Sequence, residues 1–242
     1  MPHTNISIVR LTCLVLLTGI LGCGSDLVLP DTPPSQQNVA LTKLNGDAQI
    51  GPVGEMLASP LKIKVVTETQ QAAPGLEVSF ALADPAAGTV SPPTATTNTE
   101  GEAVTYWRLG TLPGSYTATA RLVGAEGADK ITEFTATAKP AAPDTLSAQT
   151  PLSQPGRRSQ PVATPPQVRV VDRFGNPVPD VPVSWQVTAG QGNVSSPIST
   201  TDALGVASTE WTLGNLRGVQ KLAAAIEGAH GSPLTFTATV LF

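Results

Sequence analysis

Few side chains in this 242-residue chain can do chemistry. It has two cysteines, Cys13 and Cys23, and two histidines, His3 and His230. Since both cysteines and His3 lie in the first 23 residues, the rest of the chain has no cysteine for a disulfide or a thiolate metal site. The remaining histidine, His230, lies in a Gly-Ala-His-Gly-Ser segment typical of an exposed loop, and no Gly-x-Ser-x-Gly segment accompanies it. We therefore predict no catalytic residue, no metal site and no cofactor.

Carboxylates occur mainly beside glycines that are expected in turns. Glu100 and Glu102 flank Gly101, and further aspartates recur near the turns of the C-terminal half. Asp and Asn side chains accept hydrogen bonds from turn backbone. Calcium needs six to eight converging oxygens, and no Asp-x-Asp-x-Asp spacing is present. Turn formation therefore explains these residues better than a calcium site. The residues predicted to form turns are Gly101, Gly175, Asn176, Asp202 and Gly205.

The first 22 residues have the pattern of an export signal. The segment from Leu11 to Leu21 is nearly continuously apolar and follows Arg10. A membrane-spanning helix needs about 20 apolar residues, so this shorter segment predicts a signal peptide that is removed after export.

The residues Ile20-Leu21-Gly22-Cys23 resemble the bacterial lipobox. The resemblance implies cleavage of residues 1–22 and lipidation of Cys23, whose acyl chains hold the chain in a membrane. Gly24 follows in place of Asp, which favours the outer membrane in a Gram-negative cell. Residues 23–38, rich in Pro, Ser and Gln, are predicted to be a flexible tether. The alternatives are a plain secreted protein or a misread start codon.

The overall composition excludes some partners. The formal net charge is −4, and no Lys/Arg cluster is larger than the pair Arg157-Arg158, so we predict no nucleic-acid binding. Only 13% of residues are charged, against about 25% in typical globular domains. Thr, Ser, Ala, Gly and Pro replace them, which favours strands joined by turns.

The chain after residue 38 contains two copies of one pattern. Pro74–Phe80 aligns with Pro179–Trp185 at an offset of 105 (179 minus 74). Phe134–Ala138 aligns with Phe236–Val240 at an offset of 102 (236 minus 134). Apolar residues alternate within these blocks, which indicates strands with one buried face.

About seven short strands for every ~100 residues indicate a sandwich. We therefore predict an all-β fold with two tandem immunoglobulin-like antiparallel β-sandwiches, at residues 39–139 and 144–242. A Pro-rich linker at residues 140–143 joins them.

The aromatic residues on these alternating positions are predicted to form the cores. They are Phe80, Trp107, Phe134, Trp185, Trp211 and Phe236. Trp107 and Trp211 could instead offer flat faces for stacking on sugars. Their matching positions in both copies, in phase with Leu109 and Leu213, favour burial.

The second copy carries a family resemblance. Its segments Val170–Val183 and Thr201–Ala207 resemble the bacterial immunoglobulin-like domains (group 1) of the invasin and intimin type. The resemblance implies an exported, non-enzymatic sandwich that acts as a spacer or adhesive module. The first copy departs from it at Thr67–Ala73, which argues against a ligand site shared by both copies at that turn.

Two functions therefore remain open for this lipid-anchored chain. One is a structural or adhesive surface lipoprotein, and the other is a subunit that specifically binds a glycan or an envelope protein. Either would contact the membrane through its anchor and a protein or polysaccharide through its sandwiches.

Overall fold

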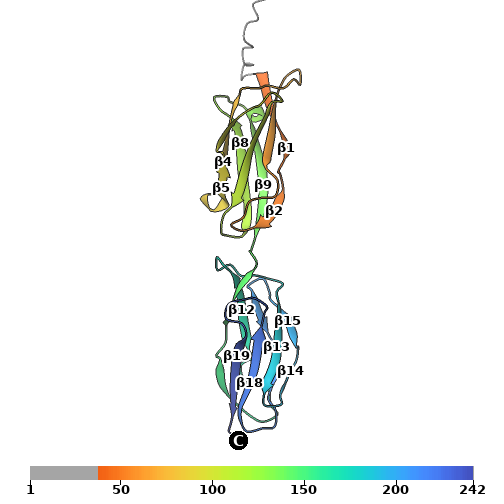
Figure 1. Ribbon diagram of the computed structural model, residues 1–242, viewed down its shortest axis with the longest axis vertical. Coiled ribbons are helices and arrows are strands. Elements are labelled where there is room, and N and C mark those ends of the chain that lie inside the picture. Colours follow the sequence, from red (N-terminus) through yellow and green to blue (C-terminus); the bar gives the residue numbers. More distant parts are fainter. Residues whose placement is uncertain (1–37, 242) are drawn as a thin grey trace, which may run out of the picture. The chain divides into compact units, whose positions relative to one another are not determined.

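The computed structural model describes residues 38–241, which form strands, turns and short 3-10 helices (Figure 1). The described residues contain no helix with the length and hydrophobicity needed to cross a bilayer. The prediction of an all-β fold built from sandwiches is confirmed.

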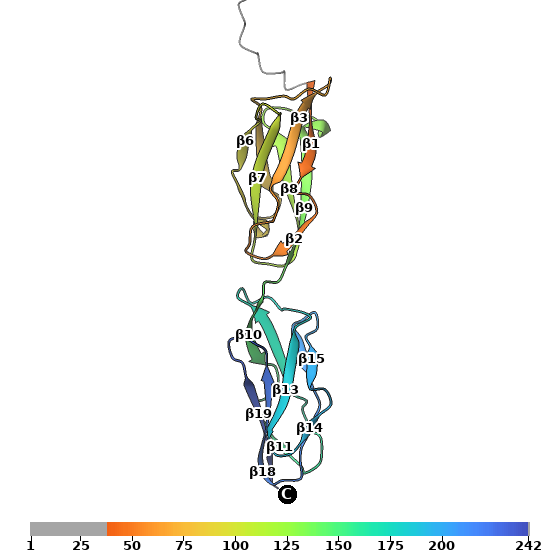
Figure 2. The same ribbon diagram turned by 45° about the vertical axis from the view of Figure 1, so that its right-hand side comes forward.

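The first sandwich has two sheets with the strand orders β1-β3-β7-β5 and β2-β9-β8-β4-β6 (Figures 1 and 2). Its strands are β1 (Val39–Asn45), β2 (Gln49–Pro52), β3 (Leu61–Thr67), β4 (Glu77–Leu82), β5 (Gly88–Ser91), β6 (Thr94–Thr96), β7 (Glu102–Leu109), β8 (Gly114–Leu122) and β9 (Ile131–Lys139). The short 3-10 helices η2 (Pro85–Ala87) and η3 (Ala128–Lys130) lie in loops between strands.

The second sandwich repeats this arrangement. One side holds the sheet β10-β12-β16 and the short pair β14-β17, and the other holds β11-β19-β18-β13-β15. Its strands are β10 (Pro143–Ala148), β11 (Ser153–Gly156), β12 (Gln167–Asp172), β13 (Pro182–Ala189), β14 (Asn193–Val194), β15 (Ile198–Thr200), β16 (Val206–Ser208), β17 (Trp211–Thr212), β18 (Gly218–Ala225) and β19 (Leu234–Val240).

In each copy the first strand is interrupted, and its two halves belong to different sheets. The sequence did not predict this interruption. β1 pairs antiparallel with β3, but β2 pairs in parallel with β9 in the other sheet. β10 and β11 do the same with β12 and β19. A chain that crosses to the facing sheet without reversing direction meets the last strand in parallel. All other pairs of named strands are antiparallel, as predicted, so these two parallel pairs are the exception. The divided first strands also raise the strand count above seven.

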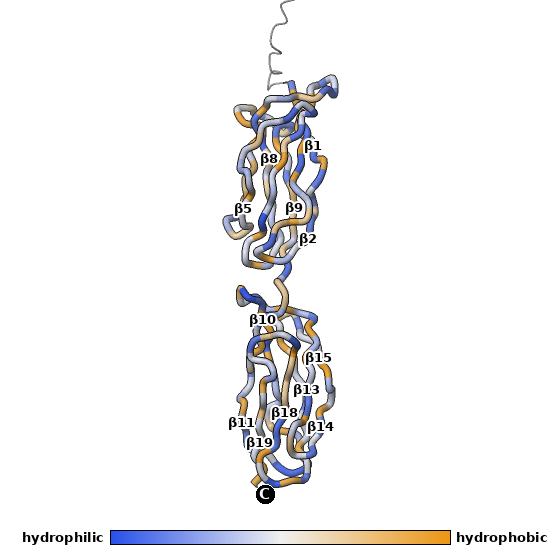
Figure 3. The backbone as a smooth tube through the Cα atoms, viewed as in Figure 1, coloured by the Kyte–Doolittle hydropathy of each residue, from blue (hydrophilic) through white to orange (hydrophobic). Residues whose placement is uncertain are grey.

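Each sandwich has its own hydrophobic core. Alternate side chains of β4 and β13 point inward, as Val78 and Phe80 do in the first copy and Val183 and Trp185 in the second. Hydrophilic and hydrophobic residues accordingly alternate along many strands (Figure 3). The rings of Trp185 and Phe236 lie 6.2 Å apart between centroids at 38°, within the usual range for aromatic pairs.

The two central tryptophans differ in one hydrogen bond. Trp107 and Trp211 are both fully buried. The Trp107 Nε1–H donates to the Ala87 carbonyl oxygen at 2.9 Å, whereas Trp211 Nε1 has no partner among the described residues. A buried donor without a partner retains its desolvation cost.

This difference predicts unequal effects of the same substitution. Trp107→Phe and Trp211→Phe remove similar volume, but only Trp107→Phe also removes a hydrogen bond. We expect Trp107→Phe to lower the free energy of unfolding of its own sandwich by about 1 kcal/mol more than Trp211→Phe does. Urea unfolding followed by circular dichroism measures both. Equal losses, or a larger loss for Trp211→Phe, would contradict the assignment.

Candidate functional site

Three of the predicted turn residues, Gly101, Asp202 and Gly205, belong to a hydrogen-bonded module that occurs in both copies. In the second, Asp202 Oδ1 accepts from the backbone N–H groups of Leu204 and Val206, both at 2.9 Å. In the first, Asn98 Oδ1 accepts from Glu100 at 3.0 Å and Glu102 at 2.9 Å. Asn and Asp are equivalent here because both offer a side-chain oxygen two bonds from Cβ.

The module needs a glycine. Gly205 has φ +73°, and a Cβ atom at this position would lie 2.5 Å from the Val170 carbonyl oxygen. The Val170 N–H also donates to the Gly205 carbonyl at 2.8 Å, so the two backbones are fixed close together. Gly101 repeats these features against Val65, with φ +74° and the same 2.5 Å separation. Only glycine combines this φ with this approach.

A buried threonine completes the module, and sequence reasoning gave it no role. The Thr201 hydroxyl donates to the Val178 carbonyl and accepts from the Val181 N–H, both at 2.8 Å. Thr97 makes the same pair of bonds in the first copy and is 4% exposed. Both threonines directly precede the turn Asn or Asp in the aligned repeat, which is the signal that could have identified them.

Asp172 fixes the chain where it enters the second sandwich. Its carboxylate accepts from the N–H groups of Phe174 and Asn176, both at 2.9 Å, and from the Asn176 side chain. Oδ2 also accepts from the N–H of Ala141 in the predicted linker, at 2.9 Å. This carboxylate thus joins the linker to the turn that contains Gly175.

Burial alone would raise the pKa of Asp172, which is 2% exposed. Hydrogen bonds from the Asn176 side chain and from the backbone of Ala141, Asn176 and Phe174 outweigh that effect, so the pKa lies below its usual 3.8. Asp172 is therefore held as a carboxylate that stabilises its turn.

The first copy builds the same turn from other residues. Thr67 Oγ1 accepts from the Gln71 N–H at 3.2 Å, and Gln70 adopts φ +63° where the second copy has Gly175 at +85°. The departure from the family pattern at Thr67–Ala73 thus changes the side chains and retains the turn. The carboxylate that closes the turn in the second copy, Asp172, is thus replaced in the first copy by the neutral hydroxyl of Thr67.

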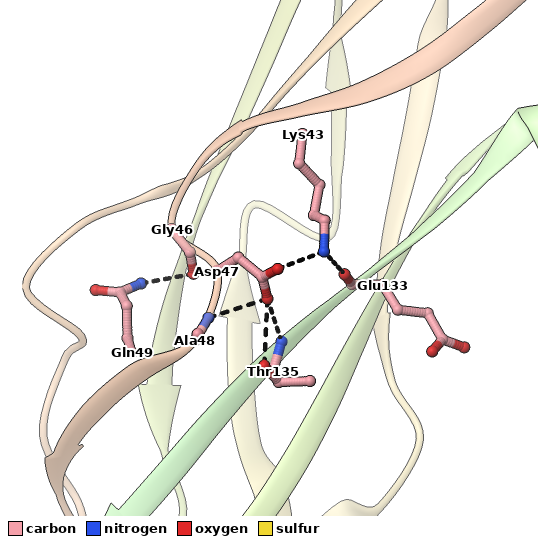
Figure 4. Close-up of polar contacts among 7 residues, drawn as sticks. All are labelled: Lys43, Gly46, Asp47, Ala48, Gln49, Glu133 and Thr135. Carbon is pink, nitrogen blue, oxygen red and sulfur yellow. Dashed lines mark hydrogen bonds and ion pairs between the residues drawn. The ribbon is translucent and has the colours of Figure 1, made fainter.

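A second carboxylate with a lowered pKa, that of Asp47, lies between β1 and β2. Asp47 forms an ion pair with Lys43, and its Oδ1 accepts from the N–H groups of Thr135 at 2.9 Å and Ala48 at 3.0 Å (Figure 4). Lys43 also donates to the Glu133 carbonyl at 2.9 Å. The Lys43 hydrogen bond, followed by that from Thr135, lowers the pKa of Asp47 to about 2. Asp47 and Lys43 thus connect the crossing segment to β9.

The other predicted site residues lie in the core or outside the described residues. The six core aromatics are 3% exposed or less. His230 is exposed, and its backbone bonds to Asp144 and Leu146. Cys23 and nearly all of the tether at 23–38 lie outside the described residues. Among residues 38–241, no group of three His, Cys, Asp or Glu side chains could hold a metal ion.

The turns around Asp172 and Asp202 fall in the segment that comparison with known families identifies. Residues 163–239 match the family model of the bacterial Ig-like domain (group 1). The resemblance to bacterial Ig-like domains found in the sequence is thereby confirmed. Comparison with curated proteins gave no match.

Solved structures of bacterial adhesins share the fold of the bacterial Ig-like domain. The Escherichia coli adhesin FdeC is 19% identical with a TM-score of 0.51, over 86% of this chain and 65% of FdeC. Yersinia pseudotuberculosis InvD is 15% identical with a TM-score of 0.50, over 85% of this chain and 58% of InvD. The D00-D0 domains of intimin also match, at 15% identity and a TM-score of 0.44, over 84% of this chain and all of that one. The chain thus spans less than two thirds of the FdeC and InvD chains.

Replacing Gly205 and Gly175 by alanine should destabilise the second sandwich to different degrees. Gly205→Ala combines a left-handed φ with a backbone clash, so we expect it to cost about 3 kcal/mol. Gly175→Ala has no atom within 4 Å of the added Cβ and should cost only about 1 kcal/mol of backbone strain. Denaturant unfolding followed by the fluorescence of Trp185 and Trp211 compares them. Equal losses would refute the close-approach argument.

The two carboxylates predict a pH-dependent stability. A carboxyl with a lower pKa in the folded state stabilises that state when ionised. Its contribution is complete above the unfolded pKa of about 3.9 and is lost as pH falls through the folded value. For Asp47 that window runs from about pH 4 to about pH 2.

We therefore expect Asp47→Asn and Asp172→Asn to lower the melting temperature at pH 7 and to approach the wild type as the solution is acidified. Thermal melts across this range measure the difference. Glu126→Gln removes one negative charge from an exposed loop and serves as the control. A constant difference between wild type and Asp47→Asn at all pH values would contradict the assignment.

Proposed function

We propose that the chain is a non-enzymatic surface lipoprotein whose tandem sandwiches act as a spacer or adhesive module. The match of residues 163–239 to the bacterial Ig-like domain carries the proposal. The fold shared with the adhesin FdeC supports it. In this proposal the side chains of both copies serve mainly to fix turns and strand crossings, which suits a rigid module.

The anchor in this proposal is Cys23. Processing at the Ile20-Leu21-Gly22-Cys23 segment leaves an acylated cysteine at the new N-terminus, and two or more acyl chains give stable membrane attachment. Residues 23–38 then act as the tether between membrane and first sandwich. Gly24 favours outer-membrane placement in a Gram-negative cell.

A specific binding subunit is the second candidate. A groove of about 580 Å³ on the second sandwich, lined in part by Arg157 and Leu241, favours it. The groove is open to solvent, so its form suits an extended ligand better than an enclosed small molecule.

Replacing Cys23 tests the anchor. We expect Cys23→Ser to move the protein from the membrane and detergent phase to the aqueous phase and to abolish incorporation of labelled palmitate, because serine cannot form the thioether. Cys13→Ser is the matched control, since Cys13 lies in the segment predicted to be removed. Surface protease treatment of intact cells should digest the wild type. Continued membrane partitioning of Cys23→Ser would overturn the anchor.

A further inference from the structure

The groove lies at one end of the second sandwich, where β11, the loop after it and the end of β19 meet. Figure 2 shows β11, β18 and β19 near the C-terminal end of this sandwich. Its lining includes Pro155, Arg157, Gln160, Pro161, Thr239 and Leu241. The groove thus combines apolar faces with a guanidinium, an amide and a hydroxyl group.

The pairing of β11 and β18 with β19 brings Arg217, which is distant in sequence, to the same end of the sandwich as the groove. Val240 pairs with Gly156 on one side and with Gly218 on the other. Arg157 directly follows Gly156 and Arg217 directly precedes Gly218, so both arginines lie one residue beyond the pairs that flank Val240. The loop before β18 is held there by the Gln220 side chain, which donates to the Leu216 carbonyl at 2.9 Å. Two arginines 60 positions apart (217 minus 157) therefore lie at the end of β19 that is followed by the exposed Leu241.

This end of the sandwich is strongly basic. Residues 153–163, 210–221 and 234–241 contain four basic residues and one acidic residue, Glu210, which the antiparallel bridge between Pro161 and Thr212 places opposite Ala163. We call this set the basic end: Arg157, Arg158, Arg217 and Lys221. All four are exposed, and none forms an ion pair with another described residue. The chain as a whole has a net charge of −4, so this positive field is local.

The fold does not require these charges. The repeat aligns Arg157 and Arg158 with Pro52 and Val53, at an offset of 105, and Arg217 with Pro113, at an offset of 104. Val53 is fully buried in the first core, whereas Arg158 is exposed. The basic end is therefore specific to the second copy.

We propose that the basic end and its groove bind an anionic polysaccharide whose sugars carry carboxylates. The inference rests on the proposed surface function and names its ligand class. Guanidinium groups bind carboxylates through paired hydrogen bonds, and repeated charges along a polymer can engage several arginines at once. Proline and leucine faces pack against sugar rings, while Gln160 and Thr239 can bond to hydroxyls. The concave groove suits a chain better than a flat membrane surface.

Binding of oligogalacturonate to the full chain tests the proposal. The fully methyl-esterified oligosaccharide is the neutral control, and vesicles containing phosphatidylglycerol test the membrane alternative. We expect saturable binding of the acid form that weakens with salt. Replacing Arg157, Arg158 and Arg217 by Gln should weaken it at least about tenfold.

Two variants separate the groove from general charge. Ala163 also lines the groove, and Ala163→Leu narrows the groove without changing charge or adding an aromatic face, so it should also weaken binding. A triple variant with Lys64, Arg121 and Lys139 changed to Gln removes equal charge from the first sandwich and should bind normally. Circular dichroism melts verify that each variant folds.

Several results would overturn the proposal. They are no saturable binding, equal affinity for the esterified form, insensitivity to Ala163→Leu or to the arginine changes, or binding to the vesicles in place of the oligosaccharide. Each would leave lipidation of Cys23 and membrane partitioning unaffected, so failure of this inference is distinguishable from failure of the proposed function.

Discussion

Both sandwiches depend on satisfying backbone polar groups where the chain passes between sheets. Downstream of Cys23 the chain has no cysteine, so no disulfide can fix these passages. A short side chain does so in each copy: the hydroxyl of Thr97 or Thr201 joins two backbone groups, and the following Asn98 or Asp202 holds the turn. Unpaired buried backbone groups are costly, so this satisfaction permits the close strand packing around the core.

Equivalent positions in the two copies make the same hydrogen bonds even where the residue types differ. The Tyr116 hydroxyl donates to the Leu112 carbonyl at 2.9 Å, and in the second copy the Gln220 amide donates to the Leu216 carbonyl at the same distance. A threonine hydroxyl and the Asp172 carboxylate likewise close matching turns. Different side chains can thus meet one geometric requirement, while charge differs between the copies.

The sequence could predict what depends on local periodicity. Alternation identified Phe80 and Trp185 as core residues, and the repeat identified Gly101 and Gly205 as turn residues. β2 and β11 escaped prediction because each has four residues, too few for a clear alternation, and each pairs with a strand more than 80 residues away. Arg217 could not be joined to Arg157 from sequence, since only the pairing of β18 and β11 with β19 brings them together.

The position of the charges distinguishes the surfaces of the two copies. Core and turn residues are constrained by packing and by backbone hydrogen bonds, so both copies keep equivalent groups there. The loop ends that carry Arg157, Arg158 and Arg217 bear no such constraint, as the uncharged counterparts Pro52, Val53 and Pro113 demonstrate. Like charges that lie close together repel one another and do not stabilise the fold. Their clustering is therefore better explained by contact with an anionic partner than by the stability of the sandwich.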